Sequence, residues 1–452
     1  MSIVSQPNGA ADVAPGRLDG ATLSANFGDL HPALTYHEAH VEAERCYFCF
    51  DAPCQQACPT SIDIPLFIRQ IAGDNALGAA RTILEANIMG GMCARVCPTE
   101  TLCEEACVRE HAEGKPVRIG LLQRHAVDAQ MATGKQPFVR GAATGKRIAI
   151  VGAGPAGLAC AHALAVAGHE ATIFEAREKP AGLNEYGIAA YKAPNDFAAE
   201  EAAFILSIGG IEVEYGKALG RDFSLDELRA NYDAVFVGIG LGAVNKLGLT
   251  GEGALVNVVD AVDWIAELRQ AKDLSELPIG RRVVVIGGGM TAVDAAVQSK
   301  RLGAEIVTIV YRRGIEDMKA SEYERELAQT NGVTIRPWAK PMSLEAHDGA
   351  VGSLLFEHTR IDDGALVGTG VAFRLEADVV FAAIGQKGAP GLFDGEAPNL
   401  KDGKLVVDEQ RRTSLKGVWA GGDCVAGGLD LTVSAVEDGK QAARSIDAAL
   451  RG

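Results

Sequence analysis

Two glycine-rich segments with the same order of strand, turn, helix and strand occupy the later part of the 452-residue sequence. The first, "KRIAIVGAGPAGLACAHALAVAGHEATIFEA", spans 146–176, and the second, "RRVVVIGGGMTAVDAAVQSKRLGAEIVTIVYRR", spans 281–313. Each is typical of a βαβ unit, whose strands lie parallel in one sheet. The repeat therefore predicts an α/β fold with two Rossmann-like nucleotide-binding domains.

The first glycine loop has the spacing of a dinucleotide site. Gly152, Gly154 and Gly157 form G-x-G-x-x-G, which allows a tight turn, close approach of a pyrophosphate and close helix packing. The following helix N-terminus favours an anion. Glu175 ends the next strand, where a carboxylate can bind ribose hydroxyls. The loop predicts FAD or NAD, and a packing turn without a ligand is the simpler alternative.

The second glycine loop differs from the first in the residues at the end of the strand that follows it. Its glycine roles fall to Gly287, Gly289 and Ala292. In place of an acid, the next strand runs into Arg312 and Arg313, which would suit the 2′-phosphate of NADP. Glu316 and Asp317 follow closely and keep NAD open, and a solvated strand end would also explain the arginines.

A late segment, "VWAGGDCVAGG", favours a flavin in the first lobe. Asp423 follows a strand and two glycines, where it could accept hydrogen bonds from ribityl hydroxyls. The helix expected near Thr432 could direct its N-terminus at the polar edge of the flavin ring. The alternative is an ordinary turn built around an aspartate.

Eight of the ten cysteines fall between Cys46 and Cys107. They form two runs: Cys46, Cys49, Cys54 and Cys58, then Cys93, Cys97, Cys103 and Cys107. A cytosolic chain with clustered thiols points away from disulfides and toward metal or redox chemistry. Soft thiolates select iron–sulfur clusters or zinc, and zinc is the alternative. Because a 4Fe–4S cluster takes four ligands, eight cysteines predict two such clusters. On spacing alone, Cys93 would be one of the ligands.

The rest of the sequence narrows the class of protein. Residues 31–132 show helical spacing of apolar residues, 132–145 have the composition of a linker, and the chain ends in a helix. The net charge of −16 argues against a nucleic-acid partner. Because we find neither a long apolar run nor a signal peptide, we expect a cytoplasmic protein that does not cross a membrane.

The order of these motifs resembles that of one enzyme family. "DAPCQQACPT", "CARVCPTETLC", "IGLLQ", "VGAGPAGL", "YRRG" and "AGGDCV…TVSAVEDGKQA" are similar to the N-terminal electron-input half of dihydropyrimidine dehydrogenase, which bacteria make as a separate subunit. The glutamate synthase small subunit is more distantly similar. The resemblance implies one cluster on Cys46, Cys49, Cys54 and Cys107, and a second on Cys58, Cys97, Cys103 and Gln123. Cys93 is then not a ligand.

The resemblance also implies nucleotide contacts. Those to FAD fall on Gly152, Ala153, Gly154, Pro155, Ala156, Gly157, Glu175, Leu183, Lys192, Leu219, Gly422, Asp423 and Thr432. Those to the nicotinamide coenzyme fall on Gly287, Gly288, Gly289, Met290, Thr291, Arg312, Arg313, Lys319, Ala383, Ile384 and Gly385. Ala181 and Lys192 depart from the family's Gly and Arg, and "GIAAYKAP" replaces a proline-containing stretch. The separate bacterial subunits are NAD-dependent, whereas Arg312 and Arg313 would suit NADP. We therefore expect either NADP(H) or NAD(H) as the coenzyme.

Together these features predict three domains: a helical iron–sulfur domain (1–143), an FAD domain (144–256 and 376–452) and an inserted NAD(P) domain (257–375). The implied activity is oxidation of NAD(P)H, with electrons passed to an FMN/iron–sulfur catalytic subunit that reduces uracil and thymine in pyrimidine catabolism. The chain would then work in a hetero-oligomer, with no catalytic acid, base or nucleophile of its own. The alternatives are a glutamate synthase small subunit, an NAD(P)H–ferredoxin oxidoreductase, or a redox-inactive scaffold that binds nucleotide and zinc.

Overall fold

The structure, a computed structural model, describes residues 12–388, 391–393 and 395–452. Its contacts divide the chain into two compact units. The described part of unit 1 comprises residues 12–30, Tyr186–Pro194 and Val244–Gln386, and unit 2 comprises His31–Glu185, Asn195–Ala243 and Lys387–Gly452. The sequence predicts three domains, with boundaries after residues 143, 256 and 375. The division into two units does not decide these boundaries, which stay a prediction.

Unit 2 begins with short helices, as the apolar spacing of 31–132 predicts. They are α2 (Tyr36–Ala43), α3 (Pro53–Ala57), α4 (Ile64–Ala72), α5 (Ala76–Ala86), α6 (Gly90–Val96), η1 (Thr99–Thr101), α7 (Val108–Glu113) and α8 (Ile119–Ala132). Local capping sets their starts: the Thr35 side chain caps α2, and Asp63 accepts a hydrogen bond from Leu66 N at the start of α4. Helix α4 buries Phe67 and Ile68 along one stripe, which holds it against its neighbours.

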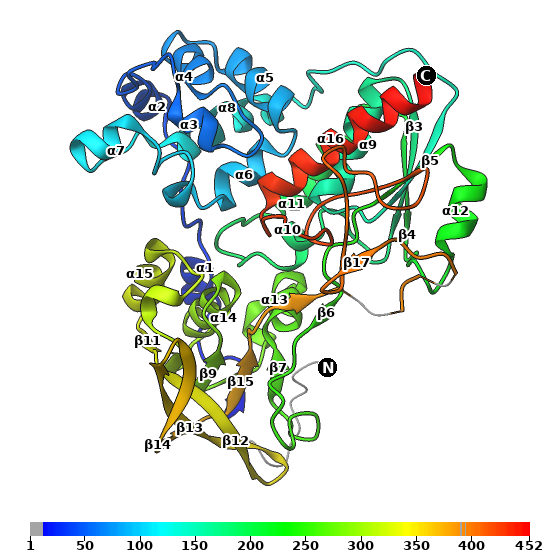
Figure 1. The fold of residues 1–452 in the computed structure, drawn as a ribbon. Helices are drawn as coiled ribbons and strands as arrows, with labels where there is room; N and C mark the ends of the chain where they lie inside the picture. Colours follow the sequence, from blue (N-terminus) through cyan, green and yellow to red (C-terminus); the bar gives the residue numbers. More distant parts are fainter. Residues whose placement is uncertain (1–11, 389–390, 394) are drawn as a thin grey trace. The chain divides into compact units, whose positions relative to one another are not determined.

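The second part of unit 2 is a five-stranded parallel sheet in the order β19-β5-β2-β3-β4. Its strands are β2 (Arg147–Val151), β3 (Glu170–Glu175), β4 (Ile211–Tyr215), β5 (Ala234–Val237) and β19 (Val418–Ala420). Its helices are α9 (Pro155–Val166), α10 (Leu183–Tyr186), α11 (Phe197–Leu206), α12 (Leu225–Asn231) and α16 (Thr432–Arg451), and two short strands, β17 (Leu400–Lys401) and β18 (Lys404–Leu405), pair beside it. Helix α16, red in Figure 1, lies along α9. The segment "VWAGGDCVAGG" thus begins with an edge strand of this sheet.

Unit 1 contains a second parallel sheet, in the order β11-β10-β9-β15-β7. Its elements are β7 (Val258–Asp260), α13 (Ala261–Gln270), η2 (Leu274–Glu276), β9 (Arg282–Ile286), α14 (Met290–Arg301), β10 (Ile306–Val310), η3 (Ile315–Asp317), α15 (Glu322–Thr330), β11 (Val333–Arg336) and β15 (Val379–Ala382). An antiparallel sheet follows: β12 (Ala339–His347), β13 (Ala350–Asp362) and β14 (Ala365–Glu376). Because these strands fall between β5 and β19 in the sequence, the second Rossmann-like sheet is inserted in the first, which confirms the predicted fold class.

Residues 12–30 belong to unit 1. Strand β1 (Val13–Ala14) pairs antiparallel with β8 (Ile279–Gly280), and helix α1 (Gly20–Asn26) places Leu23 in the same buried core as Trp264. Residues 12–30 fall within the helical domain (1–143) predicted from the sequence, and that boundary stays a prediction. Burial of Leu23 and Phe27 explains why the segment packs against the inserted sheet.

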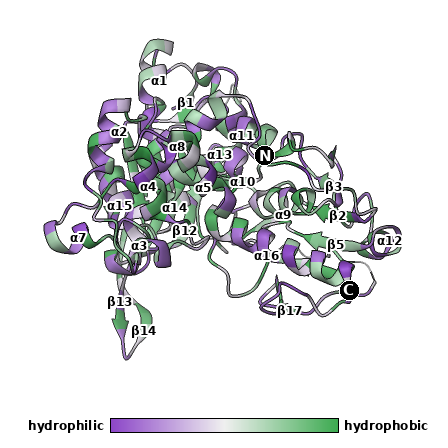
Figure 2. Cartoon of the chain, turned by 90° about the horizontal axis from the view of Figure 1, so that it is seen from above, coloured by the Kyte–Doolittle hydropathy of each residue, from purple (hydrophilic) through white to green (hydrophobic). Residues whose placement is uncertain are grey.

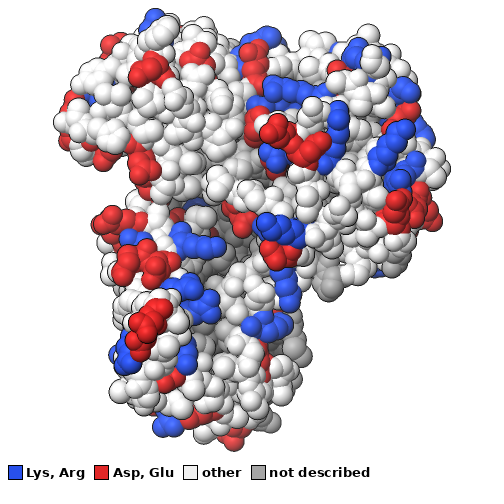
Figure 3. Space-filling model, viewed as in Figure 1, with Lys and Arg blue, Asp and Glu red and all other residues white. Residues whose placement is uncertain are grey.

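The surface and the hydropathy pattern fit a folded globular chain. Strands β2 and β5 are mainly apolar (Figure 2). Basic and acidic side chains are interspersed on the face shown in Figure 3. None of the helices in the described part of the chain has the length and hydropathy that a membrane crossing requires.

The contact between α9 and α16 generates a stability prediction. A Cβ atom on Gly439 would lie 2.1 Å from the carbonyl oxygen of Ala156, so only glycine allows this helix approach. We expect Gly439→Ala to lower the free energy of unfolding by about 1–3 kcal/mol, as overpacking does. Gly428→Ala, whose Cβ would meet Val425 at an ordinary 3.7 Å, serves as the control. Urea unfolding followed by circular dichroism checks this, and equal midpoints for the two variants would contradict it.

Candidate functional site

Four thiols from both cysteine runs line one cavity in unit 2. Cys46 and Cys49 precede α3, Cys54 lies within it, and Cys107 is the N-cap residue of α7. All ten cysteines of the chain are free. Burial, with added charge from Cys46 and Cys107, raises the pKa of Cys54 to about 12, and burial also raises the pKa of Cys46, where Arg109 opposes the rise. The structure thus brings together the four residues implied for the first cluster.

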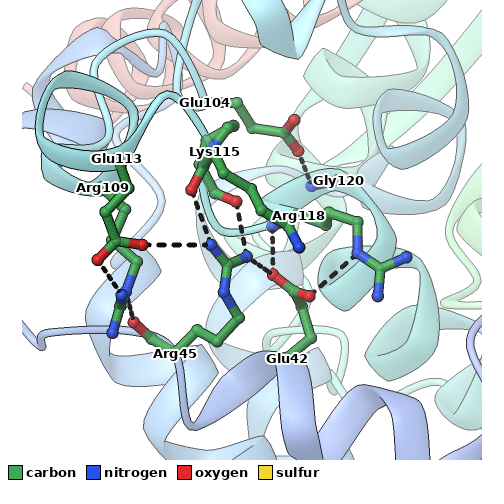
Figure 4. A network of polar contacts seen from close by, with 9 residues as sticks. Glu42, Arg45, Glu104, Arg109, Glu113, Lys115, Arg118 and Gly120 are labelled. Atoms are coloured by element: carbon green, nitrogen blue, oxygen red, sulfur yellow. Dashed lines mark hydrogen bonds and ion pairs between the residues drawn. The ribbon is translucent and has the colours of Figure 1, made fainter.

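Ion pairs and hydrogen bonds join the two ends of this thiol segment (Figure 4). The buried Glu42 carboxylate accepts from Arg45 Nη1 at 2.5 Å and from the backbone N and Nε of Arg118 at 3.0 and 3.1 Å. Arg45 also donates to the carbonyl oxygens of Lys115 and Pro116, at 2.7 and 2.8 Å. Burial would raise the pKa of Glu42, but the hydrogen bonds from Arg118 and Arg45 hold it below its usual value. The network therefore ties the chain before Cys46 to the chain after Cys107.

A second set of thiols gathers at the ends of α3 and α6. Cys58 and Cys97 are the C-cap residues of these helices, and Cys103 follows η1. A hydrogen bond with Cys93, together with burial and the charges of Cys103 and Cys58, raises the pKa of Cys97 well above its usual value. Burial, followed by the charges of Glu104 and Cys58, does the same for Cys103. These interactions place Cys58, Cys97 and Cys103 in one neighbourhood.

Gln123 and Cys93 are the two candidates for the remaining ligand. Gln123 is buried on α8, and its Nε2 donates to the carbonyl oxygen of Gly90 at 2.7 Å, so any contact with a metal falls to its Oε1. Cys93 is buried one turn before Cys97 on α6. Within the described residues, no three His, Cys, Asp or Glu side chains converge closely enough for a single metal ion. A cluster spreads its four ligands over several iron atoms and needs a wider arrangement.

Helix α6, which carries Cys93 and ends at its C-cap residue Cys97, is held by a carboxyl group from α11. Glu201 is fully buried and accepts hydrogen bonds from Gly91 N at 2.7 Å and Met92 N at 3.1 Å. The guanidinium of Arg95 lies 3.4 Å from the ring centre of Phe197 and pairs with Asp128 at 2.9 Å. Nothing in the sequence pattern indicated a role for Glu201.

The first glycine loop has the shape that a pyrophosphate requires. Gly152 has φ of +100°, and a Cβ on Gly157 would lie 1.9 Å from the Gly152 carbonyl oxygen. Gly154 is the N-cap residue of α9, which begins at Pro155 and Ala156. The buried Glu175 carboxylate accepts from Ala153 N and Arg177 N, both at 2.8 Å. Glu175 therefore lies beside the loop, as a ribose ligand would.

Further predicted flavin residues lie in unit 2, some of them against this loop. Ala181 N donates to Ala153 O at 2.8 Å, which places the turn before Leu183 against the loop. Leu219 packs in the core with Phe174 of β3. Gly422 N donates to Asp438 at 2.8 Å, and burial raises the pKa of Asp423 to about 6. Thr432 opens α16 and donates to Asn184 at 2.7 Å.

The second glycine loop lies in unit 1, between β9 and α14. A Cβ on Gly287 would lie 2.1 Å from the carbonyl oxygen of Ala383, so the predicted segment Ala383, Ile384 and Gly385 borders the loop. A Cβ on Gly288 would lie 2.5 Å from the ring of Tyr311, and the carbonyl oxygen of Gly288 accepts from Ala320 N at 3.0 Å. Gly289, Met290 and Thr291 lead into α14. Arg312 and Lys319 are exposed and Arg313 is half-buried. Arg312 and Arg313 follow Tyr311 directly, and Lys319 precedes Ala320, so all three basic residues are close in sequence to residues beside the loop.

Lys192 has a different environment from the other predicted flavin residues. It lies in unit 1, where its buried ammonium group is 2.7 Å from both Asp294 and Glu324. Burial lowers its pKa, but the two carboxylates outweigh burial and keep that pKa well above its usual value. Its role at a flavin stays a prediction.

Comparisons with known proteins match the cysteine-bearing region and the nucleotide-binding region to two families. Residues 23–135 match the family described as dihydropyrimidine dehydrogenase domain II, 4Fe-4S cluster, and 146–439 match the pyridine nucleotide-disulphide oxidoreductases. The chain is 36% identical over 424 residues to the NAD-dependent dihydropyrimidine dehydrogenase subunit PreT of Escherichia coli K12, covering 94% of this chain and 97% of that protein. It is 34% identical to the putative oxidoreductase AegA of the same strain, covering 96% of this chain and 69% of AegA.

Solved structures show the same fold at lower identity. FprA from Mycobacterium tuberculosis in complex with NADPH has a TM-score of 0.57 at 20% identity, over 68% of this chain and 85% of FprA. Thioredoxin reductase from T. acidophilum has a TM-score of 0.53 at 20% identity, over 68% of this chain and all of that chain.

Glu201 gives a prediction for the pH dependence of stability. Burial raises its pKa to about 8, although hydrogen bonds from Met92 and Gly91 oppose the rise. Between about pH 5 and 8 the folded chain therefore holds a proton that the unfolded chain has lost, so this group lowers stability as pH rises. We expect Glu201→Gln to remove this dependence, a difference on the order of a few kcal/mol across the window. Urea unfolding at several pH values measures it, and parallel pH profiles of the two proteins would refute it.

Proposed function

Because the chain belongs to the family of the bacterial dihydropyrimidine dehydrogenase subunit PreT, we propose that it is the electron-input subunit of such an enzyme. It would oxidise NADH or NADPH and deliver electrons to a partner that reduces uracil or thymine. The observation that carries the proposal is the cavity lined by Cys46, Cys49, Cys54 and Cys107, in the same unit as the first glycine loop. A cysteine-lined cavity in the same unit as a dinucleotide fold suits a chain that moves electrons.

The residues of unit 2 fit a flavin and two clusters. The Gly152–Gly157 loop would hold the pyrophosphate, Glu175 the ribose, and Asp423 the ribityl chain. Each thiol set would hold one 4Fe–4S cluster, the second with Gln123 as its fourth ligand. When bound, these groups convert a two-electron donor into single-electron transfers. The protein's part is to position them and exclude water, so we assign no catalytic acid or base.

The subunit names of the relatives support a partner protein. We propose an FMN/iron–sulfur catalytic subunit and a hetero-oligomer, working in the reducing cytoplasm where free thiols persist. The test is an anaerobic pull-down of the full chain, assayed for uracil-dependent oxidation of NADH and NADPH. Activity with a co-eluting FMN protein would support the proposal. Uracil turnover by the chain alone, or a glutamate-forming or ferredoxin-like partner in its place, would overturn it.

The choice between Gln123 and Cys93 can be tested by iron content. With two clusters we expect about eight iron atoms per chain. Cys97→Ser and Gln123→Ala should lose up to about half of the iron, because a cluster that lacks one ligand is held poorly, whereas Cys93→Ser should keep nearly all of it. Iron and acid-labile sulfide analysis of anaerobically purified protein measures this. Loss of iron in Cys93→Ser with full retention in Gln123→Ala would reverse the assignment.

The basic residues beside the second glycine loop favour NADPH, whereas PreT relatives are named as NAD-dependent. If Arg312 binds the 2′-phosphate, Arg312→Gln should lower kcat/KM for NADPH by tenfold or more, since a charge-assisted contact contributes about 1.5–3 kcal/mol. The value for NADH should change little, because NADH lacks that phosphate. Steady-state reduction of an artificial acceptor measures both constants. An equal loss with both coenzymes would contradict a phosphate contact.

A further inference from the structure

The cavity of the first thiol set contains one permanently charged side chain. Of the described residues that line it, Arg109 carries a guanidinium, whereas most of the others are cysteines or apolar residues such as Ile64 and Val117. A guanidinium stays protonated at all working pH values. In an apolar cavity its charge acts at low effective dielectric and is screened little by salt.

Arg109 is fixed from three sides, two of which Figure 4 shows. Its Nε donates to the carbonyl oxygen of Arg45, the residue before Cys46, and its Nη1 lies 2.5 Å from Glu113 Oε1. Its guanidinium carbon lies 4.0 Å from the ring centre of Tyr47, whose hydroxyl donates to Glu113 at 2.9 Å. Only 18% of the Arg109 side chain is exposed, against 40% for Glu113. The cation is therefore held at the cavity, and its counterion is the more hydrated partner.

We propose that Arg109 sets the reduction potential of the group bound by Cys46, Cys49, Cys54 and Cys107, and that Glu113 moderates its charge. The inference rests on the proposed function, namely that these thiols hold a 4Fe–4S cluster. A cluster gains one negative charge on reduction, so a fixed cation beside its ligands stabilises the reduced form and raises the potential. Arg109 would thus make this cluster a better electron acceptor.

The test is an anaerobic redox titration of the full-length holoprotein, followed by electron paramagnetic resonance. The signal of this cluster is identified by its loss in Cys54→Ser. Arg109→Gln should lower its midpoint potential by about 59 mV or more, a tenfold change in the ratio of reduced to oxidised cluster. Arg109→Lys, which keeps the charge, should restore most of the shift. Glu113→Gln should move the potential in the opposite direction, upward.

Arg118→Gln is the matched control. It removes the same charge from the same network, but Arg118 pairs with Glu42 at 3.1 Å and is 47% exposed. We expect little change in potential. Equal shifts in Arg109→Gln and Arg118→Gln, or shifts of the same sign in Arg109→Gln and Glu113→Gln, would overturn the inference.

The same experiment separates the two proposals. A wild-type chain without iron in this cavity would overturn the proposed function and the inference with it. A chain with the cluster but with an unchanged potential in Arg109→Gln would overturn the inference alone. If Arg109→Gln fails to retain its cluster, the direction of the shift in Glu113→Gln decides.

Discussion

The arrangement of unit 2 depends on the buried carboxyl group of Glu201. It comes from α11 of the nucleotide-binding part and accepts hydrogen bonds from N–H groups in the first turn of α6, the helix that ends at Cys97. Left without a partner in a buried place, such groups cost about 1–3 kcal/mol each. Gly91 makes the contact possible, because a Cβ there would lie 2.6 Å from the ring of Phe197. One contact therefore joins the thiol-bearing helices to the lobe with the first glycine loop.

The thiols depend in turn on interactions between charged groups. Glu42 and Arg45 draw the chain before Cys46 toward the chain after Cys107, although about sixty residues separate the two cysteines. Burial raises the pKa values of Cys54 and Cys103. Thiolates packed this closely repel one another, so a cationic iron–sulfur core would stabilise them. The fold thus brings the cysteines to positions where a bound cluster would stabilise them as thiolates.

Much of this could be predicted from the sequence. Glycine spacing and apolar strands indicated both Rossmann-like units, and helical periodicity indicated the region 31–132, because these signals are local. The position of β15 between β9 and β7 could not be predicted, since "VVFA" is a fully buried strand with no alternation to assign it to a sheet. The packing of Leu23 and Phe27 in unit 1 is a long-range property of the same kind.

The site was predictable in part. The thiol groupings came from resemblance rather than from spacing, and the structure brings Cys107 to the first run as the resemblance implied. Glu201 lies beside Glu200 in an alanine-rich helix, and periodicity alone does not reveal which carboxylate is buried. Arg109 stood out only once the cavity and its apolar lining were known.

The most direct test of the central claim is the cofactor content of the anaerobically purified wild-type chain. The account predicts a brown-yellow protein with one FAD, and with iron and acid-labile sulfide in equal amounts of about eight per chain. A colourless chain that holds zinc and no sulfide would contradict it.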